Sequence, residues 1–78
     1  MEHKLEAPPR IHIFVGKTRV EFDTNMVTGL DIKVAAGVPP ENDLARRVHG
    51  ELVLVTNEET IEIKNGDHFE NLPPGTIS

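Results

Sequence analysis

Apolar and polar residues alternate along two neighbouring segments near the start of the chain, residues 11–15 and 18–23. A period of two is typical of a half-buried β-strand. The Gly-Lys pair at residues 16–17 between them suits a tight two-residue hairpin turn. With that turn, three apolar positions of the first segment lie on the same side as their partners in the second. The expected pairs are Val15 with Thr18, Ile13 with Val20, and Ile11 with Phe22.

A short helix is predicted over residues 29–36 by signals at both of its ends. Thr28 suits the N-cap position, and Asp31 three residues later completes a capping box. Gly37 suits the left-handed residue that follows a helix, and the proline pair at 39–40 prevents continuation. Two turns are not stable alone, so one face must pack on other elements. That face is expected to comprise Ile32, Ala35 and Ala36.

The rest of the chain is divided into short strands by turn residues. Residues 23–27 are interpreted as a loop, and strands are expected at 41–48, 51–55, 60–63 and 68–72. Turns are expected at 49–50 and 64–67. The whole chain then comprises a flexible leader (1–9), one α+β domain (10–72) and a flexible tail (73–78). The expected core is Ile11, Ile13, Val15, Val20, Phe22, Ile32, Ala36, Val38, Leu44, Leu52, Leu54, Ile61 and Phe69.

Composition narrows the classes of protein to consider. The chain has 78 residues, enough for one small domain. Its 13 acidic residues outnumber 8 basic ones, so it lacks the surplus of positive charge that nucleic-acid binding requires. No apolar run approaches the roughly 18 residues of a membrane span, and no secretory signal is recognisable. We therefore expect a cytoplasmic protein without nucleic-acid or membrane partners, compatible with its lack of cysteine.

Catalytic, metal and cofactor sites are not expected. No two of the four histidines are spaced as a pair of metal ligands, and no cysteine assists them. The acidic clusters lie in a chain too small to surround them with a deep pocket, and Ser78 has no base in a fixed position. The histidines are His3, His12, His49 and His68, and the acidic clusters are Glu58 with Glu59 and Asp67 with Glu70.

Three residues are candidates for contact with a protein partner. Phe14 falls opposite Arg19 on the side of the hairpin that faces away from the core, and exposed aromatic residues are enriched at interface hot spots. It could instead be covered by the last strands or stacked under Arg19. Arg46 and Arg47 could form a basic spot for acidic partners, or be solvated charges that protect a sheet edge.

The order of hairpin, short helix and further strands resembles the β-grasp fold. Residues 33–41 are similar to the end of the ubiquitin helix, where a glycine, an aliphatic residue, two prolines and an acidic residue follow the last turn. Residues 11–17, 28–37 and 67–74 are together similar to the bacterial multi-ubiquitin family. The resemblance implies a β-hairpin, a short helix and two to three further strands.

A small protein modifier, or a relative of one, is the function that this resemblance implies. Its partners would be ubiquitin-like activating and conjugating enzymes and a metallopeptidase that trims the C-terminus. The modifier would contribute a tail that ends in a glycine carboxylate, here Gly75, because glycine fits a narrow active site. The printed sequence continues with Thr76, Ile77 and Ser78 and has no Gly-Gly pair. Either a peptidase exposes Gly75, or residues 73–75 simply end a strand.

Two other functions remain open at this stage. The chain could be a β-grasp adaptor that binds a partner without being conjugated. It could also resemble the sulfur carriers of thiamine and molybdopterin synthesis, although these end in Gly-Gly. If it is a modifier, its lysines could accept further copies, and the sequence does not distinguish among them. They are Lys4, Lys17, Lys33 and Lys64.

Overall fold

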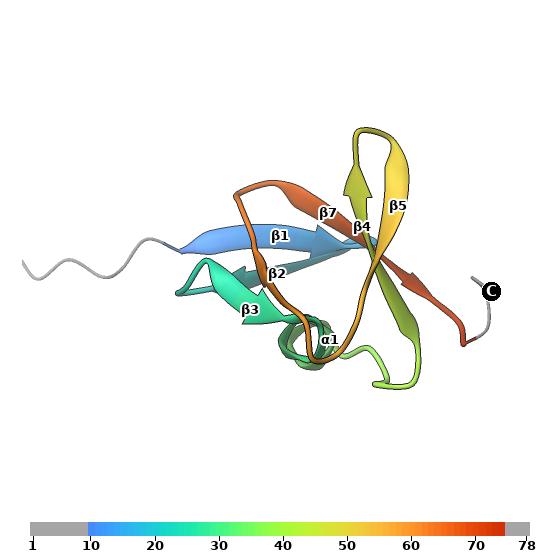
Figure 1. Ribbon diagram of the computed structural model, residues 1–78. Helices are drawn as coiled ribbons and strands as arrows, with labels where there is room; N and C mark the ends of the chain where they lie inside the picture. The colour runs from blue at the N-terminus through green and yellow to red at the C-terminus, as the bar shows by residue number, and fades with distance from the viewer. Residues whose placement is uncertain (1–9, 75–78) are drawn as a thin grey trace, which may run out of the picture.

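A computed structural model describes residues 10–74 of the chain (Figure 1). The predicted leader, residues 1–9, lies outside this range. So do residues 75–78, which include Gly75. The helix of the described part is not long and apolar enough to cross a membrane.

The N-terminal hairpin has the predicted register. It consists of β1 (Ile11–Val15) and β2 (Thr18–Phe22), which pair antiparallel. Ile13 pairs with Val20, and Phe14 pairs with Arg19 on the other side. Gly16 has a positive φ of 60°, which suits the tight turn. The agreement confirms that turn length and side-chain alternation together set the pairing.

The helix α1 (Gly29–Ala36) begins and ends where the sequence predicts. The Thr28 hydroxyl accepts a hydrogen bond from the Asp31 amide at 3.0 Å, and the Asp31 carboxylate accepts one from the Thr28 amide at 3.0 Å. Gly37 adopts a φ of 74° and ends the helix. The predicted packing face is only partly right, because Ala35 is exposed while Lys33 is buried.

The predicted loop at 23–27 is wrong at its end. Met26–Thr28 forms a short strand, β3, which pairs antiparallel with β6 (Thr60–Glu62) in a separate two-stranded sheet. Val27 lies opposite Ile61 in this pair. Three residues are too few to show alternation, and the partner strand lies far along the chain, so local sequence gives no signal for β3.

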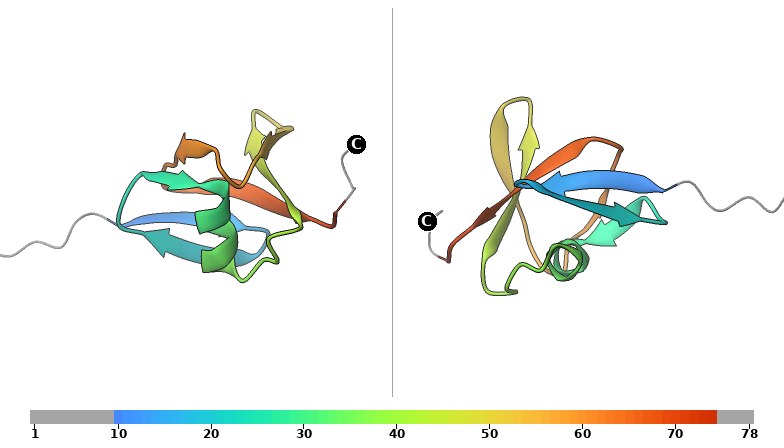
Figure 2. Two further views of the ribbon diagram at one scale, coloured as in Figure 1. Left: turned by 60° about the horizontal axis from the view of Figure 1, so that its bottom comes forward. Right: turned by 180° about the vertical axis from the view of Figure 1, so that it is seen from behind.

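The main sheet contains five strands in the order β2-β1-β7-β4-β5. Its C-terminal half is formed by β4 (Asp43–Val48), β5 (Glu51–Val55) and β7 (Asp67–Leu72). The last strand, β7, is central: it runs parallel to β1 and antiparallel to β4. The α1 helix lies across one face of the sheet (Figure 2). This is the β-grasp arrangement. Four strands follow the helix, at the four segments expected from the residue pattern, where the resemblance alone implied two to three.

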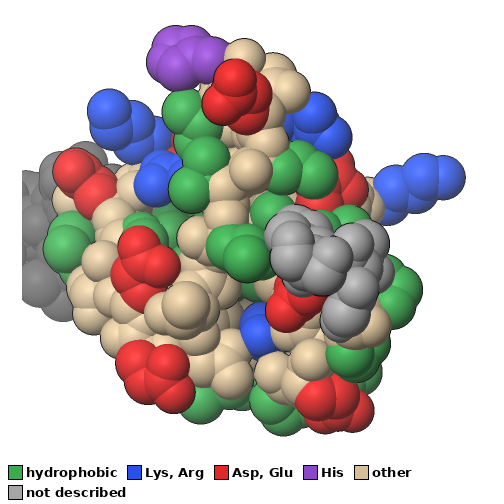
Figure 3. Space-filling model, turned by 45° about the vertical axis from the view of Figure 1, so that its right-hand side comes forward, with side chains coloured by type: hydrophobic (Ala, Val, Ile, Leu, Met, Phe, Trp, Pro, Cys, Tyr) green, Lys and Arg blue, Asp and Glu red, His purple; other side chains and the backbone are tan. Residues whose placement is uncertain are grey.

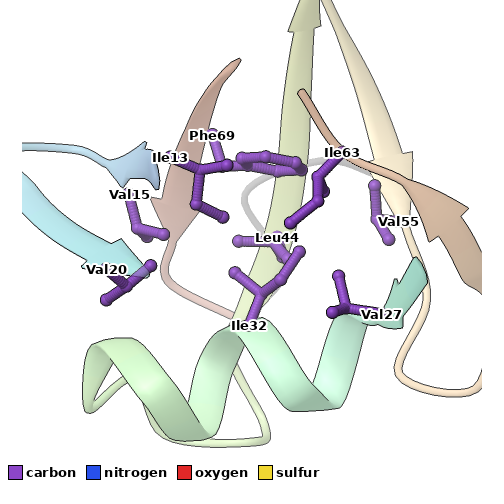
Figure 4. Packing of buried hydrophobic residues seen from close by; sticks show 9 residues of the cluster. All are labelled: Ile13, Val15, Val20, Val27, Ile32, Leu44, Val55, Ile63 and Phe69. Atoms are coloured by element: carbon purple, nitrogen blue, oxygen red, sulfur yellow. The ribbon is translucent and has the colours of Figure 1, made fainter. Parts of the chain in front are cut away.

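One hydrophobic core lies between α1 and the sheet. Ile32 points from the helix toward Leu44 and the side chains above it, and Phe69 lies among them with none of its surface exposed (Figure 4). The buried apolar residues of this core are Ile13, Val15, Val20, Val27, Ile32, Leu44, Val55, Ile63 and Phe69. Ala45 is also buried, but on the other face of the sheet. Partly buried residues at the margin of the core are Ile11, Phe22, Ala36, Val38 and Ile61.

The expected core is wrong for β5. Leu52 and Leu54 are 42% and 45% exposed, while Val55 is buried in their place. The strand pairings place both leucines on the face of the sheet opposite α1. Val53 lies on the helix side but is also exposed, because the β4–β5 hairpin projects beyond the part of the sheet that the helix covers (Figure 1). Val27 and Ile63 are core residues that the sequence pattern did not identify.

Candidate functional site

The face of the main sheet opposite α1, which we call the outer sheet face, gathers most of the candidate residues. Side chains alternate along each strand, so the neighbours of buried residues point to this face. The strand pairings place residues from all five strands on it. They are Arg19 and Glu21 of β2, His12 and Phe14 of β1, His68 and Glu70 of β7, Ala45 and Arg47 of β4, and Leu52 and Leu54 of β5.

An aromatic cluster occupies the middle of the outer sheet face. Phe14 and His68 are paired positions of the parallel strands β1 and β7. Their rings stack with centroids 5.1 Å apart and an interplanar angle of 19°, and the His12 ring meets Phe14 edge-on at 5.8 Å. Arg19 instead forms an ion pair with Glu21 at 3.0 Å. Phe14 is therefore half-buried between His12 and His68. The sequence pattern did not place His68 beside it.

The two arginine candidates lie on opposite faces of β4. Arg46 belongs to the core side, where its side chain is 24% exposed. One terminal nitrogen donates to the Asp67 carboxylate at 2.7 Å and to the Glu62 carbonyl oxygen at 2.6 Å. Its guanidinium also lies 5.7 Å from the centre of the Phe69 ring. These contacts tie β4 to β7 and to the end of β6.

Arg47 belongs to the outer sheet face and is more exposed. It donates to the Glu70 carboxylate at 3.0 Å, across the boundary between β4 and β7. The structure thus brings Phe14 and Arg47 to one face and places Arg46 on the other. Of the two arginines, Arg47 is the better placed to contact a protein that binds the outer sheet face.

Substituting these neighbouring arginines should separate structural from surface roles. Arg46→Ala is expected to lower the free energy of unfolding by about 1.5–3 kcal/mol, because it leaves the half-buried Asp67 without its charged partner. Arg47→Ala, the matched control, breaks an exposed ion pair and is expected to cost less than about 1 kcal/mol. Urea denaturation measures both values. Equal losses for the two variants would contradict this assignment.

Exposed apolar side chains gather on the β4–β5 hairpin. Val48, Leu52, Val53 and Leu54 are between 37% and 48% exposed. Figure 3 shows hydrophobic side chains along this hairpin, interspersed with basic ones. A continuous apolar run such as that of β5 is typical of a strand buried on both faces. Here the residues of the run are exposed instead. Such a patch on a small domain is a candidate contact surface for another protein chain.

Lys33 differs from the other lysines because it is almost fully buried, at 4% exposure. Its ammonium donates to the Asn57 side-chain oxygen at 2.6 Å and to the Pro40 carbonyl oxygen at 3.1 Å. These bonds link α1 to the segments after it and after β5. Lys17 and Lys64 are exposed, and Lys4 lies outside the described residues. Burial makes Lys33 a poor acceptor for any conjugating enzyme.

Chemical acetylation of the folded protein should reveal this difference. Lys17 and Lys64 are expected to react at least about tenfold faster than Lys33, which requires local opening of the structure, and an opening free energy of about 1.4 kcal/mol gives that factor. Peptide mass spectrometry over a time course measures each rate. In denaturant the rates should converge, and early modification of Lys33 in the native protein would contradict its placement.

The C-terminal candidate, Gly75, lies outside the described residues. The last strand, β7, ends at Leu72, which pairs with Asp43 at the beginning of β4. Within residues 10–74, no three histidine or acidic side chains are grouped so that they could hold a metal ion.

Comparison with models of known protein families gives a match over most of the chain. A model of the family described as Multiubiquitin matches residues 11–70, from the first residue of β1 to within β7. Searches of curated proteins and of solved structures found no match. The match covers β1 to β6, the helix and the first part of β7, so it agrees with the resemblance seen in the sequence.

Proposed function

The chain belongs to the Multiubiquitin family, and from this premise we propose that it is a ubiquitin-like protein modifier joined to its targets through Gly75. The observation that carries the proposal is the position of the last strand. β7 is held in the middle of the sheet between β1 and β4, and Gly75 follows its last residue, Leu72, after two prolines. A folded body would thus be recognised while its C-terminal segment enters an enzyme.

The chemistry of this proposal belongs to partner enzymes. A processing metallopeptidase would hydrolyse the bond between Gly75 and Thr76 and leave a free carboxylate on Gly75. An activating enzyme would adenylate that carboxylate from ATP and release pyrophosphate. A lysine amine of the target, brought by a conjugating enzyme, would attack the Gly75 carbonyl of the acyl adenylate, release AMP and form an isopeptide bond. Glycine suits this role because its carbonyl is unhindered.

Variants at the cleavage site test this proposal in cells that carry the partner enzymes. A chain with an N-terminal tag should give additional bands of higher mass on denaturing gels. Gly75→Val should abolish these bands, because a branched side chain obstructs the carbonyl and the enzyme channel. Ser78→Ala, the matched control, should leave them unchanged. Adducts that persist in Gly75→Val, or the absence of adducts from the unaltered chain, would overturn the proposal.

A second function, a binding adaptor that is not conjugated, is favoured by the outer sheet face. The Phe14–His68 stack and Arg47 present aromatic and basic groups together, a combination enriched in protein interfaces. An adaptor predicts that a bound partner is lost in Phe14→Ala and retained in Gly75→Val. A modifier predicts that covalent adducts depend on Gly75. The two variants therefore distinguish the functions.

A further inference from the structure

Strand β5 lies at one edge of the main sheet and has only β4 beside it. Its pairing with β4 determines which backbone groups face outward. A two-residue turn at 49–50 makes Val48 and Glu51 a hydrogen-bonded pair, and such pairs then recur at every second residue. Val53 therefore bonds to β4, whereas the backbone groups of Leu52 and Leu54 point away from the sheet.

The two edges of the sheet are protected to different degrees. The opposite edge strand, β2, carries exposed Arg19 and Glu21. Natural sheets use such charges, or proline and bulges, to prevent edge-to-edge pairing. β5 has none of these between its first and last residues: Leu52, Val53 and Leu54 are 42%, 48% and 45% exposed. It is a regular five-residue strand with a continuous apolar centre, so its outward backbone groups are available for pairing.

We propose that β5 binds β5 of a second copy of this chain, antiparallel, with Val53 opposite the second copy's Val53. In this register Leu52 falls opposite the second copy's Leu54, and both residues have outward-facing backbone groups. Their amides and carbonyls can therefore exchange hydrogen bonds, which a shift by one residue would prevent. The main sheets of the two copies would join into one continuous sheet.

The side chains of β5 match their own copies on both faces of the strand. Leu52 and Leu54 lie on the outer sheet face, so the pairing gathers four leucines there from the two copies. Val53 meets its equivalent on the other face. The one charged residue of the strand, Glu51, falls opposite the second copy's Val55, so the two Glu51 carboxylates lie at opposite ends of the joined strands. The register therefore places no like charges opposite each other.

The charges beside β5 favour this occupant over an acidic peptide. Arg46 and Arg47, the basic residues of the adjoining strand, already form ion pairs with Asp67 and Glu70 at 2.7 and 3.0 Å. Anionic groups would compete with these carboxylates. The centre of the strand is instead neutral and apolar, and the centre of a second copy's β5 has the same character. A contact confined to one strand is small, so we expect weak, reversible association.

Sedimentation equilibrium of the purified chain over a range of concentrations tests the proposal without partner enzymes. The unaltered chain should change from 8.7 kDa toward twice that mass as its concentration rises. Val53→Lys should weaken self-association at least about tenfold, because two ammonium groups would face each other at the centre of the contact. Val34→Lys, a control at an exposed residue of α1, should associate like the unaltered chain.

The register is tested by complementary charges. Val53→Glu alone should also be monomeric, but an equimolar mixture of Val53→Lys and Val53→Glu should form a heterodimer, because opposite charges then meet at the centre. Backbone amide spectra establish that each variant is folded. If either variant loses its fold, Leu54→Lys and Leu52→Glu replace the pair, since these positions face each other across the contact.

Several results would overturn the proposal. They are a chain that stays monomeric at millimolar concentration, self-association that Val53→Lys leaves unchanged, and lysine and glutamate variants that do not associate when mixed. Association of the β5 strand only with a different protein would also overturn it. None of these results bears on conjugation through Gly75, so the proposed function and this inference can fail separately.

Discussion

Phe69→Ala is expected to destabilise the domain by about 3–5 kcal/mol, the usual cost of removing a fully buried aromatic side chain. The ring lies in the strand at the centre of the sheet and contacts the core below it, and the Arg46 guanidinium lies near its face. A core of this size rarely provides more than about 3–5 kcal/mol of stability in total. The variant should therefore be largely unfolded at 25 °C, as far-ultraviolet circular dichroism and urea titration would show.

Phe14→Ala provides the matched control for this prediction. Phe14 has the same side chain and pairs with the neighbouring residue of β7, but it lies on the outer sheet face and is half-buried. Its loss removes one ring stack, worth about 0.5–1.5 kcal/mol beyond the buried area. A Phe69→Ala variant that unfolds cooperatively with the same midpoint as Phe14→Ala would show that the core is placed wrongly.

Gly29→Ala is expected to destabilise the domain by about 1–3 kcal/mol, although alanine favours helices by about 1 kcal/mol over glycine. Gly29 is buried at the first position of α1, and a Cβ atom there would overlap the carbonyl oxygen of Thr56. The backbone cannot easily yield, because Gly29 and Leu30 amides donate to the Glu59 and Asn57 carbonyls at 3.2 and 3.1 Å. Thermal unfolding of Gly29→Ala and of the unaltered chain measures the difference in their free energies of unfolding.

Val34→Ala is the control for this helix substitution. Val34 is exposed on α1, so alanine there should leave stability within about 0.5 kcal/mol of the unaltered chain or raise it slightly. A stabilising effect of Gly29→Ala that equals that of Val34→Ala would mean that α1 does not approach the 56–59 segment this closely.

The hairpin and the helix could be predicted because their signals are local. The Gly16-Lys17 turn and the alternation around it determine one register, and Thr28, Asp31 and Gly37 mark both ends of α1. The sequence also suggests the right fold class, because these two elements in this order are shared with β-grasp proteins. The family match over residues 11–70 confirms the resemblance.

The features that the sequence did not predict depend on contacts between distant parts of the chain. β3 is too short to show a pattern and exists through its pairing with β6. The stack of Phe14 on His68 follows from the parallel pairing of β1 with β7, for which neither strand carries a local signal. Leu52 and Leu54 are expected in the core because the uninterrupted apolar run of β5 does not reveal which of its faces α1 covers; the pairing with β4 puts Val55 on that face and the two leucines on the other. Lys33 is buried because Asn57 and Pro40 surround its ammonium.

The candidate site was predictable to a similar degree. The register already placed Phe14 opposite Arg19 and away from the core. Alternation along β4 puts Arg46 and Arg47 on opposite faces, yet which of them faces outward depends on the pairing of β4 with β7. The importance of Gly75 rests on the family resemblance, since nothing local distinguishes a conjugated glycine from one that ends a strand.

Mass spectrometry of adducts purified from cells with the partner enzymes tests the proposed function most directly. Trypsin cleaves after Lys64, and no lysine or arginine follows it in the printed sequence, so a conjugated target should yield a peptide whose lysine carries residues 65–75 linked through Gly75. We predict such branched peptides. Recovery of this region only as linear peptides that continue from Gly75 into Thr76 would contradict a role as a modifier.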